Sequence, residues 1–466
     1  MRSRTFEGFA LPSGTSLPSD AELLQLDAGV SLCIPPVTDE WMSELADILL
    51  ATRGDLLART PSEIAAILGR AGECFLETGN PLRLEALELL PLTSGLSPEM
   101  ARAVLDNMAA DWTEDRLVRL LQEEFGDPEV LNRFISREGR EVMAVGPKLT
   151  VQIVAGTVPG VGVGALIRSL LVRSPMLLKP GRGDLVLPVL FAHALRRVDP
   201  SLANALAVVY WRGGNDSAVD SALKKAEVVT AYGSDETVSD LRARTPVTVR
   251  FLGYHHRVSV GVVGREACTD VGVEQVADEV ARSIGFFDQR GCVSPQVVFT
   301  EKGGLCAPWE FAQALAAALE KLEAILPGGY LQTQESSSLH QIRGTAEMMG
   351  DNRGIEVLHG GNASWTVIYE EEPGPMVSCV GRVIRVCPIE DAAELPALMA
   401  PHGPHLQTVG VVGLGARLRA LSRELAYVGV SRVAPFPSVP FPPPWWHHDG
   451  GGPLLDLVRW ADLEVS

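Results

Sequence analysis

The spacing of apolar residues changes character along the chain. Between residues 39 and 145, apolar residues recur three or four positions apart, in segments separated by short runs that contain proline, glycine or aspartate. This spacing is typical of amphipathic helices, and such breaks are ordinary helix ends. We therefore expect a helical layer here, with helices over residues 41–50, 61–68, 82–90, 98–108 and 114–124.

From residue 149 onward, short apolar runs alternate with helical segments. Strands are expected over residues 149–155, 176–179, 205–211, 227–232 and 247–251, with helices over 163–172, 185–197, 217–225 and 236–242 between them. Regular alternation of strand and helix with short connections predicts a doubly wound parallel sheet. Such sheets bind ligands beyond the carboxyl ends of their strands.

A second α/β region follows over residues 258–413. Strands are expected here over 258–263, 295–299, 356–358, 366–369 and 382–387, and helices over 273–284 and 308–325. Six of the ten residues from 435 to 444 are proline, which indicates a stiff segment. The tail beyond it is expected to contain a helix over 454–460 and to dock back on the body. The domains expected are therefore 1–145, 146–257, 258–430 and 431–466.

Composition excludes several classes of protein. The net charge of −18 disfavours a protein that binds nucleic acid by neutralising phosphates. With 46% apolar and 21% charged residues, the chain is expected to fold rather than to be disordered. The seven cysteines include no CxxC pair or Cys/His cluster, which favours a reducing, cytoplasmic compartment. The uncharged stretch 149–167 contains four glycines and a proline, so we do not expect it to span a membrane.

Two loops after predicted strands carry candidate binding groups. In segment 156–165, Gly160, Gly162 and Gly164 are two residues apart and depart from the GxGxxG spacing, so a tight turn explains them as well as an anion site does. Amides at a helix start can nevertheless face an anion or a developing oxyanion. Lys179, followed by Pro180, ends the next strand and is placed to bind a ribose or phosphate, or is a surface lysine.

Cys292 is the strongest candidate for chemistry. It follows a helix and precedes a buried strand, between Gly291 and other small residues, which could expose its sulfur in a cleft. A thiolate is a good nucleophile, whereas an isolated cysteine is more often buried and structural. We expect the structural role for Cys33, Cys74, Cys268, Cys306, Cys379 and Cys387.

The order of these motifs resembles the aldehyde dehydrogenase superfamily. A GTVPG turn, a KP pair and a YGSDE segment are followed by a cysteine loop 113 residues beyond the KP lysine. Within that superfamily, QRGCVSPQ, HRVS at 256–259 and the terminal WWHHDGGGPLLDLVRW resemble the LuxC-type acyl-CoA reductases, which make fatty aldehydes from acyl thioesters. The resemblance covers about residues 140–465.

The resemblance implies a fold and a catalytic mechanism. The fold would be aldehyde dehydrogenase-like, with a dinucleotide-binding domain over 146–257 and a catalytic domain over 258–430. Cys292 would attack the thioester, expel coenzyme A and hold the acyl group until a nicotinamide hydride reduces it. Thr157 falls where relatives commonly have an oxyanion-binding asparagine, so the amide of Cys292 is the safer donor.

Two departures from the superfamily concern the reaction. Hydrolytic relatives carry a glutamate base in the segment that corresponds to 249–256, which here holds no carboxylate and so favours transfer to or from a thiol. Arg182 stands where NAD-preferring relatives often have a glutamate. An arginine could pair with a 2′-phosphate, which predicts NADPH; a solvated arginine is the alternative.

Further candidate residues lie in other segments of the chain. Gly233 and Ser234 match the superfamily loop near the nicotinamide and pyrophosphate, and Ser234 would also cap a helix. His255 or His256 could position substrate or protonate the departing thiolate, or lie exposed in a loop. The consecutive residues His447, His448 and Asp449 are poorly spaced for a metal, and Arg382 receives no role.

Together these features predict NADPH-dependent reduction of a fatty acyl-CoA to an aldehyde. The acyl donor could instead be an acyl carrier protein or an acyl-transferring protein, although the negative charge weakly favours coenzyme A. A homo-oligomer is possible. The alternatives are an oxidising aldehyde dehydrogenase, a catalytically inactive interaction protein and an acyltransferase that uses no nucleotide.

Overall fold

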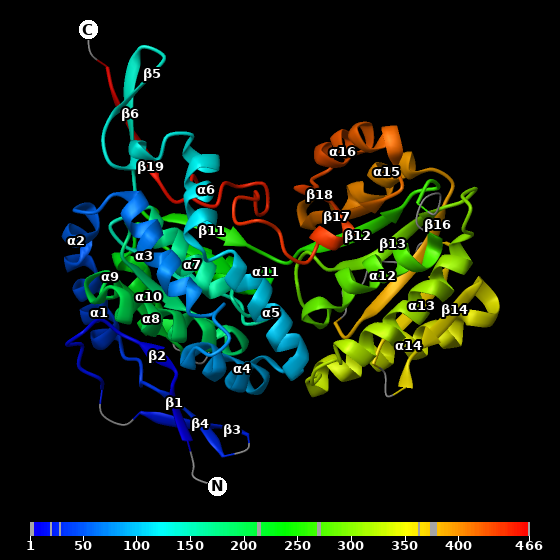
Figure 1. The fold of residues 1–466 in the computed structure, drawn as a ribbon, viewed down its shortest axis with the longest axis horizontal. Coiled ribbons are helices and arrows are strands. Elements are labelled where there is room, and N and C mark those ends of the chain that lie inside the picture. Colours follow the sequence, from blue (N-terminus) through cyan, green and yellow to red (C-terminus); the bar gives the residue numbers. More distant parts are fainter. Residues whose placement is uncertain are drawn as a thin grey trace. The chain divides into compact units, whose positions relative to one another are not determined.

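The computed structural model describes residues 4–18, 21–27, 29–211, 216–267, 272–361, 364–372 and 380–464. The chain forms two compact units (Figure 1). Unit 1 comprises Met1–Ser94, Leu105–His255 and Pro443–Ser466, and unit 2 comprises Gly95–Val104 and His256–Pro442. The four domains expected from the sequence stay a prediction.

Unit 1 is built on a six-stranded sheet in the order β11-β10-β7-β8-β9-β2. Its strands are β2 (Phe9–Ala10), β7 (Thr150–Ile153), β8 (Met176–Lys179), β9 (Leu206–Val209), β10 (Val228–Tyr232) and β11 (Arg250–Tyr254). All neighbours are parallel except β2, which pairs antiparallel with β9. The connecting helices include α7 (Val161–Leu171), α8 (Val186–Val198), α10 (Asp216–Lys225) and α11 (Asp235–Arg244). The predicted doubly wound sheet is therefore confirmed.

Helices precede this sheet, as the spacing predicts. They are α1 (Asp39–Ala51), α2 (Arg53–Leu57), α3 (Pro61–Glu73), α4 (Pro81–Ser94), α5 (Pro98–Ala110) and α6 (Glu114–Phe125). The same part of the chain also holds strands that the helical description left out: β1 (Arg4–Glu7), β3 (Glu22–Asp27), β4 (Val30–Ile34), β5 (Ile135–Arg137) and β6 (Arg140–Val145). None exceeds six residues, so each carries little periodicity for a sequence pattern to show.

The tail differs from its prediction. The expected helix over residues 454–460 is wrong, because this segment is a turn that leads into strand β19 (Arg459–Leu463). β19 pairs antiparallel with β6, with Trp460 opposite Ala144, and the two strands lie side by side in Figure 1. The Glu124 carboxylate also accepts hydrogen bonds from the amides of Leu454 and Leu455, at 2.9 and 3.0 Å. Pairing with a distant strand therefore overrides the local helical spacing.

Unit 2 holds a seven-stranded sheet in the order β14-β15-β16-β13-β12-β17-β18. The strands are β12 (Val258–Val263), β13 (Pro295–Glu301), β14 (Ile355–His359), β15 (Thr366–Glu370), β16 (Val383–Ile389), β17 (Leu406–Val412) and β18 (Arg432–Pro435). Only β14 runs antiparallel to its neighbour. Its helices include α12 (Gly272–Gly285), α13 (Pro308–Ile325), α14 (Thr333–Arg353) and α16 (Leu418–Tyr427).

No helix in the described part of the chain has both the length and the apolar character that a membrane span requires.

Glu301, the last residue of β13, connects several segments of unit 2. Its side chain is fully buried. It accepts hydrogen bonds from Arg417 at 2.6 Å, from the Ala392 amide at 2.5 Å and from the Arg265 amide at 2.7 Å. Burial alone would raise the pKa of Glu301, but these donors outweigh it and hold the pKa at about 2.

Glu301 should therefore stabilise the protein at neutral pH and lose this effect in acid. Its folded pKa lies below the ordinary value of 4.5, so the contribution is complete above about pH 4.5 and disappears as the pH falls towards 2. A shift of this size corresponds to about 3 kcal/mol. The difference in unfolding free energy between wild type and Glu301→Gln, measured by urea denaturation, should shrink as the pH is lowered from 7 to 3.5. A difference that does not change with pH would contradict this assignment.

Candidate active site

Cys292 has an exposed side chain in a loop of unit 2 whose neighbouring residues Gly291, Val293 and Ser294 are buried. It follows the segment η3 (Phe286–Gln289), whose backbone is not helical at Phe287 and Asp288, and precedes β13. Among the described cysteines it alone is exposed, whereas Cys387 is buried and Cys33, Cys74 and Cys306 are half-buried. Cys268 and Cys379, for which a structural role is expected, lie outside the described residues. Burial raises the pKa of Cys387 to about 12, and it also raises the pKa values of the Cys33 and Cys74 thiols. Of these thiols, Cys292 is the one placed to meet a substrate.

The backbone at Cys292 is fixed to the neighbouring strands. The Ser259 hydroxyl donates a hydrogen bond to the Cys292 carbonyl at 2.7 Å, and the Thr408 amide donates to the Ser259 hydroxyl at 3.2 Å. Ser259 lies near the start of β12 and Thr408 near the start of β17. Cys292 therefore sits at the amino ends of the parallel strands of unit 2.

A left-handed turn precedes the cysteine. Phe287, Asp288 and Gln289 have φ values of 57°, 49° and 63°, a conformation that side-chain-bearing residues adopt at a free-energy cost. The Gln289 side chain stabilises the turn by donating to the carbonyls of Pro295 and Val383, at 2.9 and 2.7 Å. It also accepts a hydrogen bond from the Val383 amide at 2.7 Å. The Cys292 thiol is thus presented from a preformed turn.

Arg382 supports the same turn from the residue before β16. Its guanidinium donates to Asp288 at 3.0 Å, to Glu323 at 2.6 Å and to the Leu326 carbonyl at 2.8 Å. The Arg382 and Asp288 side chains are only 1% and 3% exposed. The sequence predicts no role for Arg382, whereas the structure pairs it with Asp288. No local pattern could reveal the Arg382–Asp288 pair, since 94 residues separate the two side chains.

In unit 1, the candidate cofactor residues follow the carboxyl ends of adjacent strands. Thr157 lies in the loop after β7, Lys179 ends β8, Gly233 follows β10 and His255 follows β11. These strands are neighbours in the sheet, so the loops share one edge, where doubly wound sheets bind ligands.

Asp184, which sequence reasoning missed, lies in the loop after β8 and places its carboxylate against the first amides of α7. Its buried carboxylate accepts hydrogen bonds from the amides of Gly160 and Gly162, at 2.6 Å each. Burial raises the pKa of Asp184 to about 8, while both amide bonds act to lower it. These two amides are therefore engaged within the protein, and the expectation that they face an anion or oxyanion is wrong for them.

The two predicted loops interlock through glycines. A Cβ added at Gly181 would overlap the Gly156 amide, and one added at Gly183 would overlap the Gly156 carbonyl oxygen. The Lys179 ammonium lies 5.9 and 5.5 Å from the ring centres of Tyr210 and Trp211.

The groups on these loops differ in exposure. Lys179 is half-buried, and this burial lowers the pKa of its ammonium group. Pro180 is buried. Thr157 and Arg182 are exposed and are thus open to a ligand.

The loop after β10 has the capping geometry that the sequence predicts. Ser234 is exposed and accepts a hydrogen bond from the Thr237 amide at 3.3 Å, which caps α11. The Gly233 amide donates to the Tyr254 carbonyl at 3.1 Å. The helix thus starts beside the sheet edge that carries Lys179.

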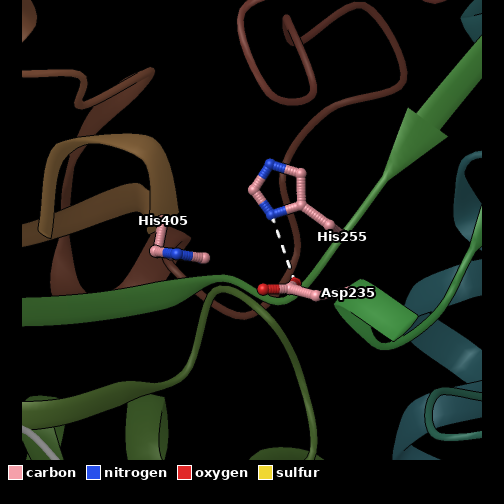
Figure 2. Close-up of side chains that lie close together, drawn as sticks. All are labelled: Asp235, His255 and His405. Atoms are coloured by element: carbon pink, nitrogen blue, oxygen red, sulfur yellow. Dashed lines mark ion pairs between the residues drawn. The ribbon is translucent and has the colours of Figure 1, made fainter. Parts of the chain in front are cut away.

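The two adjacent histidines have different partners. His255 Nδ1 lies 3.7 Å from the Asp235 carboxylate, as Figure 2 shows. In unit 2, His256 is exposed, and its carbonyl oxygen lies 3.1 Å from His405 Nδ1. In the tail, the His448 ring packs edge-on against Tyr254 with centres 4.9 Å apart, an aromatic contact within unit 1.

Comparison with solved structures defines the class of fold. Aldehyde dehydrogenase 21 from Physcomitrella patens, in complex with succinate, matches with a TM-score of 0.75 and 15% identity, covering 99% of this chain and 98% of that one. The NADP-dependent glyceraldehyde-3-phosphate dehydrogenase from Bacillus halodurans C-125, in complex with NADP, matches with a TM-score of 0.73 and 14% identity over 96% of both chains. The predicted aldehyde dehydrogenase-like α/β fold is therefore confirmed.

The family follows from the sequence itself. The sequence model of the acyl-CoA reductase (LuxC) family matches residues 59–460, and the chain belongs to this family. Long-chain acyl-protein thioester reductases from Photobacterium phosphoreum and Aliivibrio fischeri are 24% and 25% identical over 316 and 352 residues. The matches cover 66% and 73% of this chain. They span 62% and 69% of those relatives, so this chain matches less than two thirds of the P. phosphoreum protein.

Proposed function

We propose that the protein reduces an acyl thioester to an aldehyde through an acyl group held on Cys292. The observation that carries this proposal is the exposed Cys292 thiol on a turn fixed by Gln289 and Arg382. The names of the family and of its relatives support an acyl thioester as the substrate.

The Cys292 thiolate attacks the thioester carbonyl, and the departing thiol leaves as the carbonyl re-forms on the enzyme. The Cys292 amide or the Thr157 hydroxyl donates a hydrogen bond to the developing oxyanion. A bound reduced nicotinamide dinucleotide would supply the hydride that converts the acyl group to aldehyde. Collapse of the reduced adduct breaks the carbon–sulfur bond and returns the Cys292 thiolate.

The residues at the carboxyl edge of unit 1 suit such a dinucleotide. Lys179 and the exposed Arg182 offer cationic donors for ribose and phosphate, and the capped start of α11 at Ser234 offers positive helix-dipole potential. These residues would bind and orient the dinucleotide. His256, which is exposed near the start of β12, would protonate the departing thiolate.

The acyl donor in this proposal is either a coenzyme A thioester or a protein-bound thioester. The family is described as acyl-CoA reductase, while the relatives are named acyl-protein thioester reductases. Both donors present the same carbonyl to Cys292, and assays with each as the sole donor distinguish them.

Trapping of the acyl group tests the proposal. Wild type mixed with ¹⁴C-palmitoyl-CoA should retain label that hydroxylamine removes, and Cys292→Ala should retain none. Cys306→Ala, which alters a half-buried thiol, is the matched control and should label like wild type. NADPH added to the labelled enzyme should release the label as aldehyde. Equal labelling of wild type and Cys292→Ala, or release as free acid only, would refute the proposal.

Arg182 should set the choice of dinucleotide. Replacing it with glutamate removes a partner for a 2′-phosphate and adds repulsion, so the ratio of kcat/KM for NADPH to that for NADH should fall by about tenfold or more. Arg423→Glu, which changes an exposed arginine of unit 2, is the control for net charge and should leave the ratio unchanged. An unaltered ratio in Arg182→Glu would count against NADPH selection by this residue.

A further inference from the structure

Arg432 lies at the same edge of the unit 2 sheet as Cys292. It begins β18 and pairs in register with Thr408 of β17. The Thr408 amide donates to the Ser259 hydroxyl, which in turn donates to the Cys292 carbonyl. A short chain of strand pairing and hydrogen bonds therefore connects the guanidinium-bearing residue to the loop of the nucleophile.

The Arg432 side chain is held in place rather than extended into solvent. It is half-buried and donates to the carbonyls of Ser438 and Val439, at 2.6 and 3.0 Å. These two bonds fix the position of the guanidinium. Burial lowers the pKa of Arg432 to about 10, and the nearby Cys292 thiolate acts to raise it.

We infer that Arg432 is a positioning residue that favours the thiolate form of Cys292 through its fixed positive charge. An opposite charge nearby stabilises a thiolate, and a reactive cysteine needs such a setting. The inference deepens the proposed function, on whose nucleophile it rests. It assigns the activation of that nucleophile to a residue 140 positions further along the chain.

The other charged groups around Cys292 have partners of their own. Arg290 pairs with Glu335 at 3.0 Å and with Asp288 at 3.4 Å, and Arg382 pairs with Asp288. Arg257, just before β12, donates to the Pro404 carbonyl at 2.8 Å. His256 and His405 lie at the starts of β12 and β17, with ring centres 6.3 Å apart.

The test measures the rate at which iodoacetamide alkylates Cys292 between pH 5 and 10, followed by mass spectrometry of the Cys292 peptide. Arg432→Gln keeps a hydrogen-bond donor but removes the charge, so the midpoint of its profile should rise by about one pH unit. The rate at pH 7 should then fall by up to about tenfold. Arg432→Lys keeps the charge and should retain most of the wild-type rate.

A profile of Arg432→Gln that coincides with the wild-type profile would overturn the inference. If that variant does not fold, the wild-type protein decides: raising KCl from about 0.05 to 1 M should raise the midpoint, because salt screens the interaction. A midpoint that is independent of salt would then refute it. Acyl trapping on Cys292 is a separate readout. If the wild type traps no acyl group but Arg432→Gln still shifts the alkylation profile, the proposed function is refuted and this inference stands.

Discussion

Replacing Arg382 with methionine should lower the free energy of unfolding by about 3–5 kcal/mol. The substitution keeps an apolar stem but removes the 3.0 Å contact to the buried Asp288, which is left with Arg290 at 3.4 Å, and it removes the 2.6 Å bond to Glu323. Breaking one side of a buried ion pair is costly because the remaining charge loses its compensation. Equilibrium denaturation in urea, followed by circular dichroism, measures the change.

Lys302→Met provides the matched control for Arg382→Met. Lys302 pairs with Glu390 at 2.8 Å, but both side chains are largely exposed, and such pairs contribute less than about 1 kcal/mol. A loss below about 1 kcal/mol in Arg382→Met as well would show that the turn before Cys292 does not depend on the buried pair. Alkylation of Cys292 in the folded variant would then report whether the turn itself has moved.

Gly183→Ala should disrupt the candidate cofactor edge of unit 1. The new methyl group would overlap the Gly156 carbonyl oxygen, so the loops that carry Thr157 and Arg182 must move apart. Forcing extra volume into such a contact costs about 1–3 kcal/mol. We expect dinucleotide binding, measured by quenching of tryptophan fluorescence, to weaken by about tenfold or more.

Gly164→Ala separates this steric effect from the general effect of adding a methyl group. Gly164 lies within α7, and an added Cβ there would meet no described atom within 4 Å. The alanine should leave dinucleotide binding unchanged and stabilise the helix by about 0.5–1 kcal/mol. Equal binding by Gly183→Ala and Gly164→Ala would refute the role of the interlocked loops.

Sequence periodicity predicts the parallel core well, for a physical reason. Strands β8 and β12 have the predicted boundaries, because buried parallel strands are short, largely apolar runs that end at loop residues. The exposure of Cys292 could likewise be predicted from the small residues around it. These features are local, so a single sequence contains them.

The residues that hold the candidate-site loops of unit 1 and unit 2 in place could not be predicted in this way. Asp184 meets Gly160 across 24 residues, and Arg382 meets Asp288 across 94. Their partners are chosen by the packing of strands, which no spacing of apolar positions encodes. The strand at 459–463 was missed for the same reason, since its pairing with β6 decides its conformation.

The left-handed turn before Cys292 has a consequence for how the protein matures. Its bonds to Val383 and Arg382 cannot form until the chain has been made past β16 and that strand has joined the sheet. Cys292 therefore acquires its fixed orientation only after β16 has joined the sheet, and a chain truncated before that strand would present the thiol without the bonds that orient it.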